Sequence, residues 1–335
     1  MYKKLNIALL AIFTVFAISV NAAPMAYSVN ADSGNEANED SLYSIDLATG
    51  AHQKIGRLTV GTQTRLDTEG LAIAPDGTLW GIDDDALTLF PINPDSGSIR
   101  VSDEINLTGF SSGGGNDFGM TFTCENELYA TSVRTQTLYK LDVTNGANQV
   151  VGSVGALGQN ISAIASIGNP ARIYGIGNGQ FSNGTTDAPN LYSIDPETGT
   201  STLIGPLGSS AGEYNQGGLS FDADGELWAI TDRRLINNTI ADLPSQILNI
   251  DLETGKATLT STTTEVGFES LAVAPPTDCT TAPPVEPPFI PPVDPPGPGN
   301  GNALYPTIPT LSANGQIITI LLLMLMGTFV LSRRL

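Results

Sequence analysis

The chain is short of charged residues, and of basic residues most of all. Only 14% of its 335 residues are charged, with 14 Lys and Arg against 34 Asp and Glu, so its formal net charge is −20. Such a surface repels phosphate groups, which excludes a nucleic acid as partner. The chain also has one histidine, His52, and two cysteines. A zinc site of His and Cys ligands therefore cannot be assembled, and Ser-His-Asp or Cys-His catalysis would have to use His52.

The N-terminus has the pattern of a secretory signal. Lys3 and Lys4 precede an apolar run over residues 5–20, and Ala22 ends a stretch suited to signal peptidase. We predict a signal peptide over residues 1–22, with a retained N-terminal anchor as the alternative.

The C-terminus combines a short motif, an apolar segment and a basic pair. The motif consists of Ile308, Pro309, Thr310, Leu311 and Ser312. The apolar segment predicts a transmembrane helix at about 313–331, and Arg333 and Arg334 would remain on the cytoplasmic side.

This arrangement, with Gly315 after the motif, resembles the IPTL-CTERM sorting domain of Gram-negative bacteria, although Asn314 stands where the family usually has Trp. The resemblance covers residues 308–335. It implies an exosortase-like sorting transpeptidase as partner, export through the inner membrane, at least transient anchoring by the C-terminal helix, and a final place in the cell envelope or at the cell surface. A plain C-terminal anchor is the alternative, but it leaves the motif unexplained.

A proline-rich segment separates this signal from the rest of the chain. Half of the 22 prolines lie between residues 275 and 298. We predict an extended linker over residues 276–307, whose proline-rich part would be roughly 75 Å long at about 3.1 Å per residue.

Two motifs alternate along the region in front of the linker. The first, LYSIDLATG from Leu42, returns in variants that begin at Leu89, Leu138, Leu191 and Ile247. The second, GLAIAPDGTLWGI from Gly70, has echoes that begin at Gly119, Ala163 and Gly217. Each copy reads as two short strands around a turn. Two such hairpins in each period of about 50 residues indicate the blade of a β-propeller.

The ends of the repeat region complement one another. A last copy of the second motif begins at Ser270 but lacks its second strand, which residues 26–29 can supply. We therefore predict an all-β fold over residues 23–275: a five-bladed β-propeller closed by pairing of its N- and C-terminal strands. A β-sandwich is the alternative, but sandwiches do not repeat at this period. The repeats resemble those of LYGID-type bacterial propellers of unknown function.

The most regular positions of the repeat are those of turn residues. Each first motif has Asp or Asn four residues before a Gly, at Asp46, Asn93, Asp142, Asp195 and Asp251. Short side chains of this kind bond backbone N–H groups in turns, and Gly supplies the positive φ. Calcium binding at each turn is the alternative.

Another aligned position lies just before the innermost strand of each blade. It is occupied by Asp67, Asn116, Asn160 and Asn215. Four convergent oxygens at the mouth of a channel would suit Ca²⁺ or a polar ligand, whereas the ordinary explanation is that Asn and Asp begin strands after turns. The sequence indicates no other cofactor.

Two glutamates align with each other two positions after the position of Asp67 in the repeat. Glu69 and Glu269 would face each other from neighbouring blades, and paired carboxylates are the minimum equipment of a glycosidase. Asp83, Asp84 and Asp85 form a further acidic loop, for which calcium binding and an exposed charge run without a specific role are the two interpretations.

The two cysteines, Cys124 and Cys279, favour a disulfide in an exported protein. It would join one blade to the start of the linker.

Taken together, these features favour a non-catalytic surface or envelope module that binds an extracellular polymer or protein. A glycan hydrolase that uses Glu69 and Glu269, and a structural matrix component without a discrete ligand, are the alternatives.

Overall fold

The computed structural model describes residues 24–31, 40–112, 114–177, 189–234 and 243–280. The predicted signal peptide, most of the linker, the transmembrane segment and the sorting residues Ile308 to Ser312, Gly315, Arg333 and Arg334 lie outside these residues. In the described part of the chain, no helix is long and apolar enough to cross a membrane. The helical element found there is a single 3₁₀ turn, η1 (Val101–Asp103).

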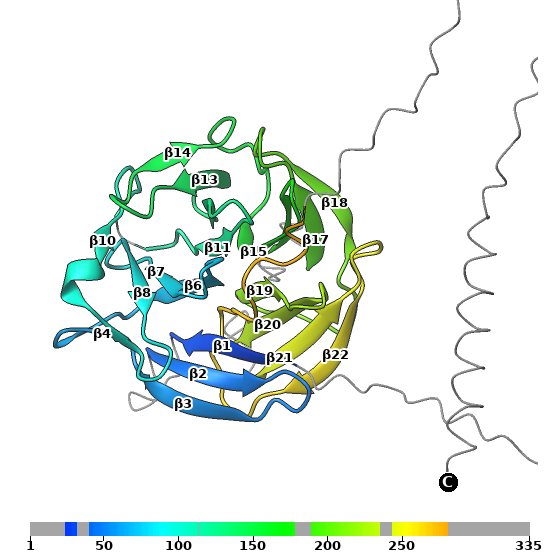
Figure 1. The fold of residues 1–335 in the computed structure, drawn as a ribbon. Coiled ribbons are helices and arrows are strands. Elements are labelled where there is room, and N and C mark those ends of the chain that lie inside the picture. The colour runs from blue at the N-terminus through cyan, green and yellow to red at the C-terminus, as the bar shows by residue number, and fades with distance from the viewer. Residues whose placement is uncertain (1–23, 32–39, 113, 178–188, 235–242, 281–335) are drawn as a thin grey trace, which may run out of the picture. The chain divides into compact units, whose positions relative to one another are not determined.

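The described residues form an all-β propeller of short antiparallel sheets (Figure 1). Its strands are β1 (Met25–Asn30), β2 (Ser41–Asp46), β3 (His52–Arg57), β4 (Thr59–Val60), β5 (Gln63–Thr64), β6 (Thr68–Ile73), β7 (Leu79–Asp83), β8 (Thr88–Ile92), β9 (Ser98–Ile99), β10 (Ile105–Asn106), β11 (Gly119–Phe122), β12 (Leu128–Ser132), β13 (Thr137–Leu141), β14 (Asn148–Val150), β15 (Ile161–Ile167), β16 (Arg172–Gly177), β17 (Asn190–Ile194), β18 (Ser201–Pro206), β19 (Gly217–Phe221), β20 (Leu227–Arg233), β21 (Leu243–Ile250) and β22 (Ala257–Thr262).

These strands make six sheets, and the prediction of five blades is therefore wrong. The strand orders are β1-β2-β3, β10-β8-β7-β6, β11-β12-β13-β14, β15-β16-β17-β18, β19-β20-β21-β22 and β5-β4-β9. The repeat count misses the last sheet because strands of two residues carry no alternating pattern. The predicted C-terminal transmembrane helix is also no part of the described fold, since residues 313–331 lie outside it.

Local turn chemistry explains why the first motif forms hairpins. The side-chain oxygen of Asp46 accepts the N–H groups of Ala48 and Thr49, and the other four Asp or Asn residues of the motif make equivalent bonds. The following glycines have φ between +69° and +75°, as Gly50 and Gly199 illustrate. These bonds explain why Asp or Asn recurs at this position, since its side chain stabilises the turn.

Aromatic side chains of the second motif pack between neighbouring sheets. The ring centroids of Trp80 and Phe122 are 6.2 Å apart, and those of Tyr174 and Phe221 are 5.7 Å apart. Both pairs belong to clusters of buried apolar residues that span two sheets. Burial of these rings between sheets is a large part of what holds the propeller together.

The innermost strands β6, β11, β15 and β19 lie side by side around the channel and run in the same direction. We call the end at which they begin the mouth, and the end at which they finish the hairpin end. Glycines allow the close approach of these strands: a Cβ on Gly119 would lie 2.8 Å from the Cα of Ala163, and a Cβ on Gly218 would lie 2.2 Å from the nitrogen of Leu271.

Residues 268–272 pair with β1 and join the two ends of the described propeller. Tyr27 and Ala272 exchange both backbone hydrogen bonds, at 2.8 and 2.9 Å. The Asn30 amide donates to the carbonyl of Val266 at 2.6 Å, and the hydroxyl of Ser28 donates to the carbonyl of Ser270. The incomplete last repeat and the extra N-terminal strand therefore belong to one sheet.

Candidate functional site

A carboxylate trio, formed by Asp67, Glu69 and Asp84, occupies the mouth. One oxygen from each residue lies within 4.8 Å of the others. The β6–β7 hairpin explains this approach. Thr68 pairs with Asp83, so the residues that flank this pair, Asp67 and Asp84, lie opposite each other, and the N–H of Asp84 donates to the carbonyl of Asp67.

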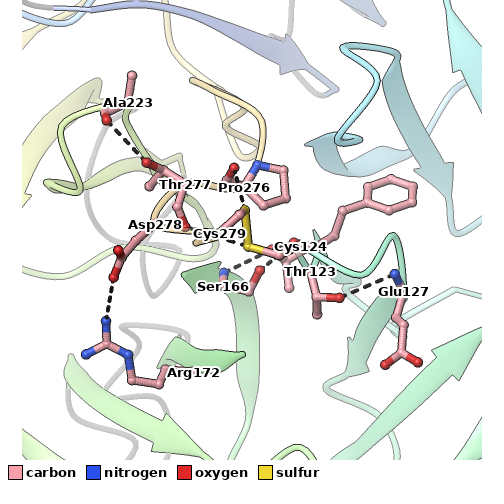
Figure 2. Close-up of a disulfide and its surroundings, with 12 residues drawn as sticks. Thr123, Cys124, Glu127, Ser166, Arg172, Ala223, Pro276, Thr277, Asp278 and Cys279 are labelled. Carbon is pink, nitrogen blue, oxygen red and sulfur yellow. Dashed lines mark hydrogen bonds and ion pairs between the residues drawn. A yellow bond between two sulfur atoms is a disulfide. The ribbon is translucent and has the colours of Figure 1, made fainter. Parts of the chain in front are cut away.

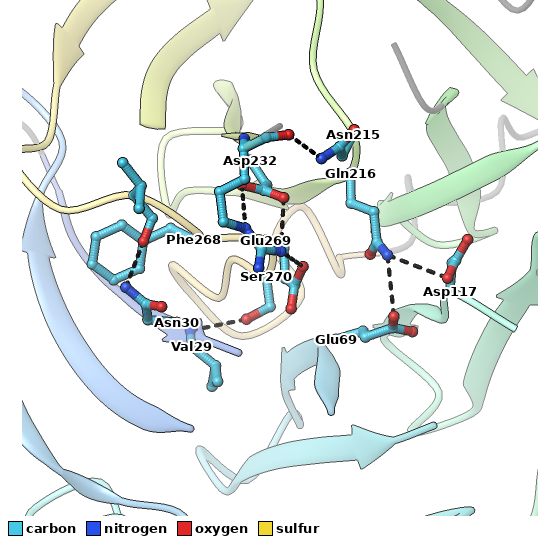
Figure 3. A network of polar contacts seen from close by, with 12 residues as sticks. Val29, Asn30, Glu69, Asp117, Asn215, Gln216, Asp232, Phe268, Glu269 and Ser270 are labelled. Atoms are coloured by element: carbon cyan, nitrogen blue, oxygen red, sulfur yellow. Dashed lines mark hydrogen bonds and ion pairs between the residues drawn. The ribbon is translucent and has the colours of Figure 1, made fainter. Parts of the chain in front are cut away.

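A glutamine connects this trio to two other sheets. Figure 3 shows the Gln216 amide pointing between Glu69 and Asp117. Its nitrogen is 3.1 Å from an oxygen of Glu69 and 3.2 Å from an oxygen of Asp117. The other oxygen of Glu69 accepts the N–H of Phe118 at 2.8 Å. Both oxygens of Glu69 therefore have a donor, and the side chain is held in place from β11 and β19.

Asp84 is fully buried and held by Asn116. One of its oxygens accepts the Asn116 backbone N–H at 2.8 Å, and the other accepts the Asn116 amide at 2.5 Å. The amide oxygen of Asn116 in turn accepts the hydroxyl of Ser132. This chain of bonds fixes the position of one member of the trio from the neighbouring sheet.

A second group at the mouth contains Arg234. Its guanidinium makes two hydrogen bonds of 2.9 Å to the buried Asp232 and lies 3.4 Å from an oxygen of Glu269. The paired bonds to Asp232 have the geometry of a strong, oriented ion pair. Arg234 therefore supplies positive charge to Glu269, whereas Glu69 has neutral amide donors.

Burial and mutual repulsion raise the pKa values of these carboxyl groups. Burial raises the pKa of Asp67 to about 7, with Asp84 and Asp83 contributing, and it raises the pKa of Asp117 to about 6, with Asp84 contributing. Burial also raises the pKa of Glu69 well above its ordinary value, and the charges of Asp117 and Asp67 add to this effect. The pKa of Glu269 is raised by burial too, although Arg234 opposes the shift. Ionisation of the carboxyl groups at the mouth is thus disfavoured, both by burial and by the charges of neighbouring carboxylates.

The residues expected at the mouth have different surroundings. Of the four aligned positions, Asp67 belongs to the trio and Asn116 holds Asp84. Asn160 accepts a hydrogen bond from Gln136 at 2.9 Å, and Asn215 donates to the carbonyl of Arg234. A register shift at the start of β15 follows directly after Asn160, so this position departs from the regular repeat.

Several residues of the site were not expected from the sequence. The sequence marks Asp84 as part of an acidic loop with calcium binding as one interpretation, but it does not single out Asp117, Gln216 or Arg234. Asp117 and Gln216 each follow directly after an expected Asn, so inspection of the neighbouring position would have found them. Arg234 has no counterpart in the repeat.

The space beside Glu69 is small. A cavity of about 10 Å³ is lined by Glu69, Ser162 and Ser270 among others, which is room for one water molecule at most. The hydroxyl of Ser162 has no hydrogen-bond partner in the described part of the chain. The inner strands therefore leave little space beside Glu69.

At the hairpin end, Cys124 and Cys279 form a disulfide (Figure 2). Residues 277–279 make further contacts with two sheets. The Thr277 carbonyl accepts the N–H of Gly168, its hydroxyl donates to the carbonyl of Ala223, and Asp278 lies 3.7 Å from Arg172. We call residues 274–280 the clasp, because they join three sheets across this end of the channel.

Comparison with other proteins agrees with this architecture. A family model described as a repeat of unknown function, DUF6923, matches residues 19–160. The match and the fold together define a repeat β-propeller domain of unknown function. No curated protein sequence matches the chain.

Solved structures of other proteins resemble the chain at low sequence identity. Virginiamycin B lyase from Staphylococcus aureus is 18% identical, with 71% of this chain and 69% of that chain covered and a TM-score of 0.39. A putative TolB from Agrobacterium tumefaciens is 13% identical, with 72% and 80% covered and a TM-score of 0.44. A gluconolactonase from Xanthomonas campestris is 12% identical, with 73% and 78% covered and a TM-score of 0.41. At these TM-scores the similarities carry no argument about what this chain does.

Proposed function

We propose that the protein is an exported, non-catalytic binding module of the cell envelope or cell surface, which holds a divalent cation at the mouth and binds its partner there. The observation that carries this proposal is the carboxylate trio, whose oxygens lie within 4.8 Å of one another. Carboxylate oxygens are the ligands that hard cations such as Ca²⁺ prefer.

The charge balance of the mouth supports a cation. Glu69, Asp84 and Glu269 are buried, and their exposed fractions do not exceed 5%. Arg234 is bound to Asp232 and lies on the Glu269 side of the mouth. Buried carboxylates without a cationic partner are costly unless they take up protons or bind a metal ion. A divalent ion between Asp67, Glu69 and Asp84 would remove this cost at neutral pH.

The same geometry explains how a partner would be bound. Ca²⁺ takes six to eight oxygen ligands. Three carboxylates leave coordination positions for oxygens of a partner, and Asp67 is only partly buried, so the site is reached from the mouth. An extracellular polymer or protein that offers carboxylate or hydroxyl oxygens would complete the coordination.

The proposal of export and surface sorting is based on sequence patterns at the two ends of the chain. The signal-peptide pattern over residues 1–22 and the sorting pattern over residues 308–335 support them, together with signal peptidase and an exosortase-like transpeptidase as processing partners. The disulfide between Cys124 and Cys279 supports the same proposal, because disulfides persist in oxidising compartments.

The hydrolase alternative is less well supported. The charge of Glu269 contributes to the raised pKa of Glu69, but both residues are buried, and Glu269 lies beside Arg234. The cavity beside Glu69 holds one water molecule at most, so a sugar ring cannot enter it. A binding role at the mouth needs no such entry.

The cation site is tested by thermal unfolding of the full-length protein in EDTA, Mg²⁺ and Ca²⁺. We expect Ca²⁺ to raise the melting temperature in a saturable manner, since a ligand that binds the folded state stabilises it. Asp67→Asn should abolish the rise. Asp76→Asn, which changes an exposed carboxylate in the β6–β7 turn, should keep it. Equal melting temperatures of the unsubstituted protein in EDTA and in either ion would overturn the proposal.

Two further measurements test export and the absence of catalysis. The intact mass of the protein from its native envelope should lack residues 1–22, and loss of everything from about Ile308 would establish sorting. Retention through Leu335 would contradict processing and leave a membrane tether.

The non-catalytic role is tested with envelope polysaccharides. It would be overturned if the protein released new reducing ends from them and the Glu69→Gln variant did not.

A further inference from the structure

The sheet of β6, β7, β8 and β10 departs from the pattern of the other large sheets. In those, the strand that follows the turn of the first motif pairs with the preceding strand from the residues next to the turn onward. Examples are the pairs Leu141–Asn148, Ile194–Ser201 and Ile250–Ala257, which lie immediately before and after the turn. In β8, by contrast, the outer strand β10 pairs only with Thr88 and Leu89. The end of β8 at Pro91 and Ile92 therefore lacks this outer partner.

The chain leaves the sheet after this turn. Asn93 and Ser98 close the turn as in the other repeats, but β9 then pairs in parallel with β4, through Thr59 with Ser98 and Val60 with Ile99. The 3₁₀ turn η1 follows, and the chain returns to β8 only at Ile105. Figure 1 shows β10 beside β8 and the short helical turn outside them.

Pro91 gives a sequence reason for this departure. The other copies of the motif have Ser44, Lys140, Ser193 and Asn249 at this position, and each of these pairs with an outer strand. Proline lacks the N–H group that a ladder needs and is found at sheet edges. A proline at an unpaired edge also disfavours the addition of an extended peptide as a further strand.

An open pocket of about 460 Å³ lies where the outer strand is missing. Its volume is within the range of small-molecule sites, roughly 300–1,000 Å³. Pro91 and Pro94 supply apolar surface, and Asp95, Ser98 and Arg100 supply polar groups, whereas Ile92 is buried. The pocket therefore combines apolar patches with hydrogen-bond donors and acceptors.

We propose that this pocket binds an uncharged saccharide. A sugar ring has an apolar face of C–H groups and a rim of hydroxyls that both donate and accept hydrogen bonds. The pocket matches both properties. Its charges disfavour an anion, because Arg100 already lies 3.6 Å from Asp103 and the Asp95 carboxylate adds negative charge. The proposal does not depend on the cation site, since the pocket shares no residue with the trio.

The test uses saturation-transfer NMR on the full-length protein with maltotriose, cellotriose and chitotriose as neutral probes, and glucose 6-phosphate and glucosamine as charged ones. We expect saturable binding of at least one neutral probe. Asp95→Ala and Arg100→Ala should each weaken it by about tenfold, since each removes a polar contact. Both side chains are exposed, so folding should be unaffected.

Glu197→Ala is the matched control. Glu197 has the place of Asp95 in the Asp-Pro-Glu turn between β17 and β18, where the outer strand is present. This variant should bind as the unsubstituted protein does. The proposal is overturned if no neutral probe binds saturably, if only a charged probe binds, or if Asp95→Ala and Arg100→Ala bind as tightly as Glu197→Ala. None of these outcomes depends on Ca²⁺, so they are distinct from a failure of the cation site.

Discussion

The side-chain nitrogen of Gln216 donates a hydrogen bond of 3.1 Å to Glu69, although 147 residues separate the two in sequence. The contact spans the mouth from the start of β19 to β6. The same nitrogen reaches Asp117, so one neutral amide lies between two carboxyl groups that would otherwise repel each other.

Gln216→Ala should therefore destabilise the protein by about 1–2 kcal/mol, because it leaves oxygens of Glu69 and Asp117 without their shared donor. Urea unfolding of the full-length protein measures the change. Gln63→Ala removes an exposed glutamine and serves as the control. Equal stabilities of the two variants would show that the contact contributes nothing.

The mouth should make the stability of the metal-free protein depend on pH. Asp67, with its pKa raised to about 7, and Asp117, with its pKa raised to about 6, keep their protons at a pH where the unfolded chain has lost them. The folded state is therefore favoured at acid pH, and this contribution is lost as pH rises from about 4 to about 7. In EDTA, the melting temperature should fall over this range, and Asp67→Asn should flatten the fall. A melting temperature that rises steadily to pH 8 in EDTA would contradict this assignment.

Removal of the disulfide should have a larger effect than loss of a hydrogen bond. Cys124 and Cys279 are 155 residues apart, so the bond restricts a long loop of the unfolded chain. We expect Cys124→Ser with Cys279→Ser to cost about 2–4 kcal/mol. Unsubstituted protein treated with dithiothreitol should unfold like the double variant, whereas the double variant itself should not respond. An unchanged melting temperature after complete reduction, verified by thiol titration, would refute the expected effect.

Gly218→Ala should disrupt the packing between β19 and the closing strand. A Cβ at this position would lie 2.2 Å from the nitrogen of Leu271, a distance at which backbone must move. We expect a loss of several kcal/mol, which is typical of overpacking against rigid atoms. Circular dichroism during heating measures it, with the exposed Ser153→Ala as the control. A variant as stable as the control would mean that the inner strands are free to separate.

The hairpins of the fold could be predicted because their determinants are local. Asp46 and Gly50 act within one turn, and the same spacing recurs four more times, so sequence alone indicates the strands on either side. The sheet of β4, β5 and β9 could not be predicted. Its two-residue strands are too short to show an alternation of apolar and polar residues. The parallel pairing of Val60 with Ile99 also depends on the path of the intervening loops.

The site was predictable only where it follows the repeat. The register of the motifs places Asp67 and Glu69 at the mouth, and the structure adds Asp84 to them. The contacts of Gln216 and Arg234 depend on loop paths and side-chain directions, which no repeated position encodes. The Cys124–Cys279 bond follows from a different argument, namely the presence of two cysteines in a chain that we expect to be exported.

The clasp also determines how the fold would respond to mechanical load. Tension applied to the chain after Thr280 reaches Cys279 first and passes through the sulfur bridge into the β11–β12 turn at Cys124. Tyr27 and Ala272, whose hydrogen bonds join the closing strand to β1, lie outside this load path. A pull from the C-terminal side would thus enter the propeller through a covalent bond rather than through the hydrogen bonds of Tyr27 and Ala272.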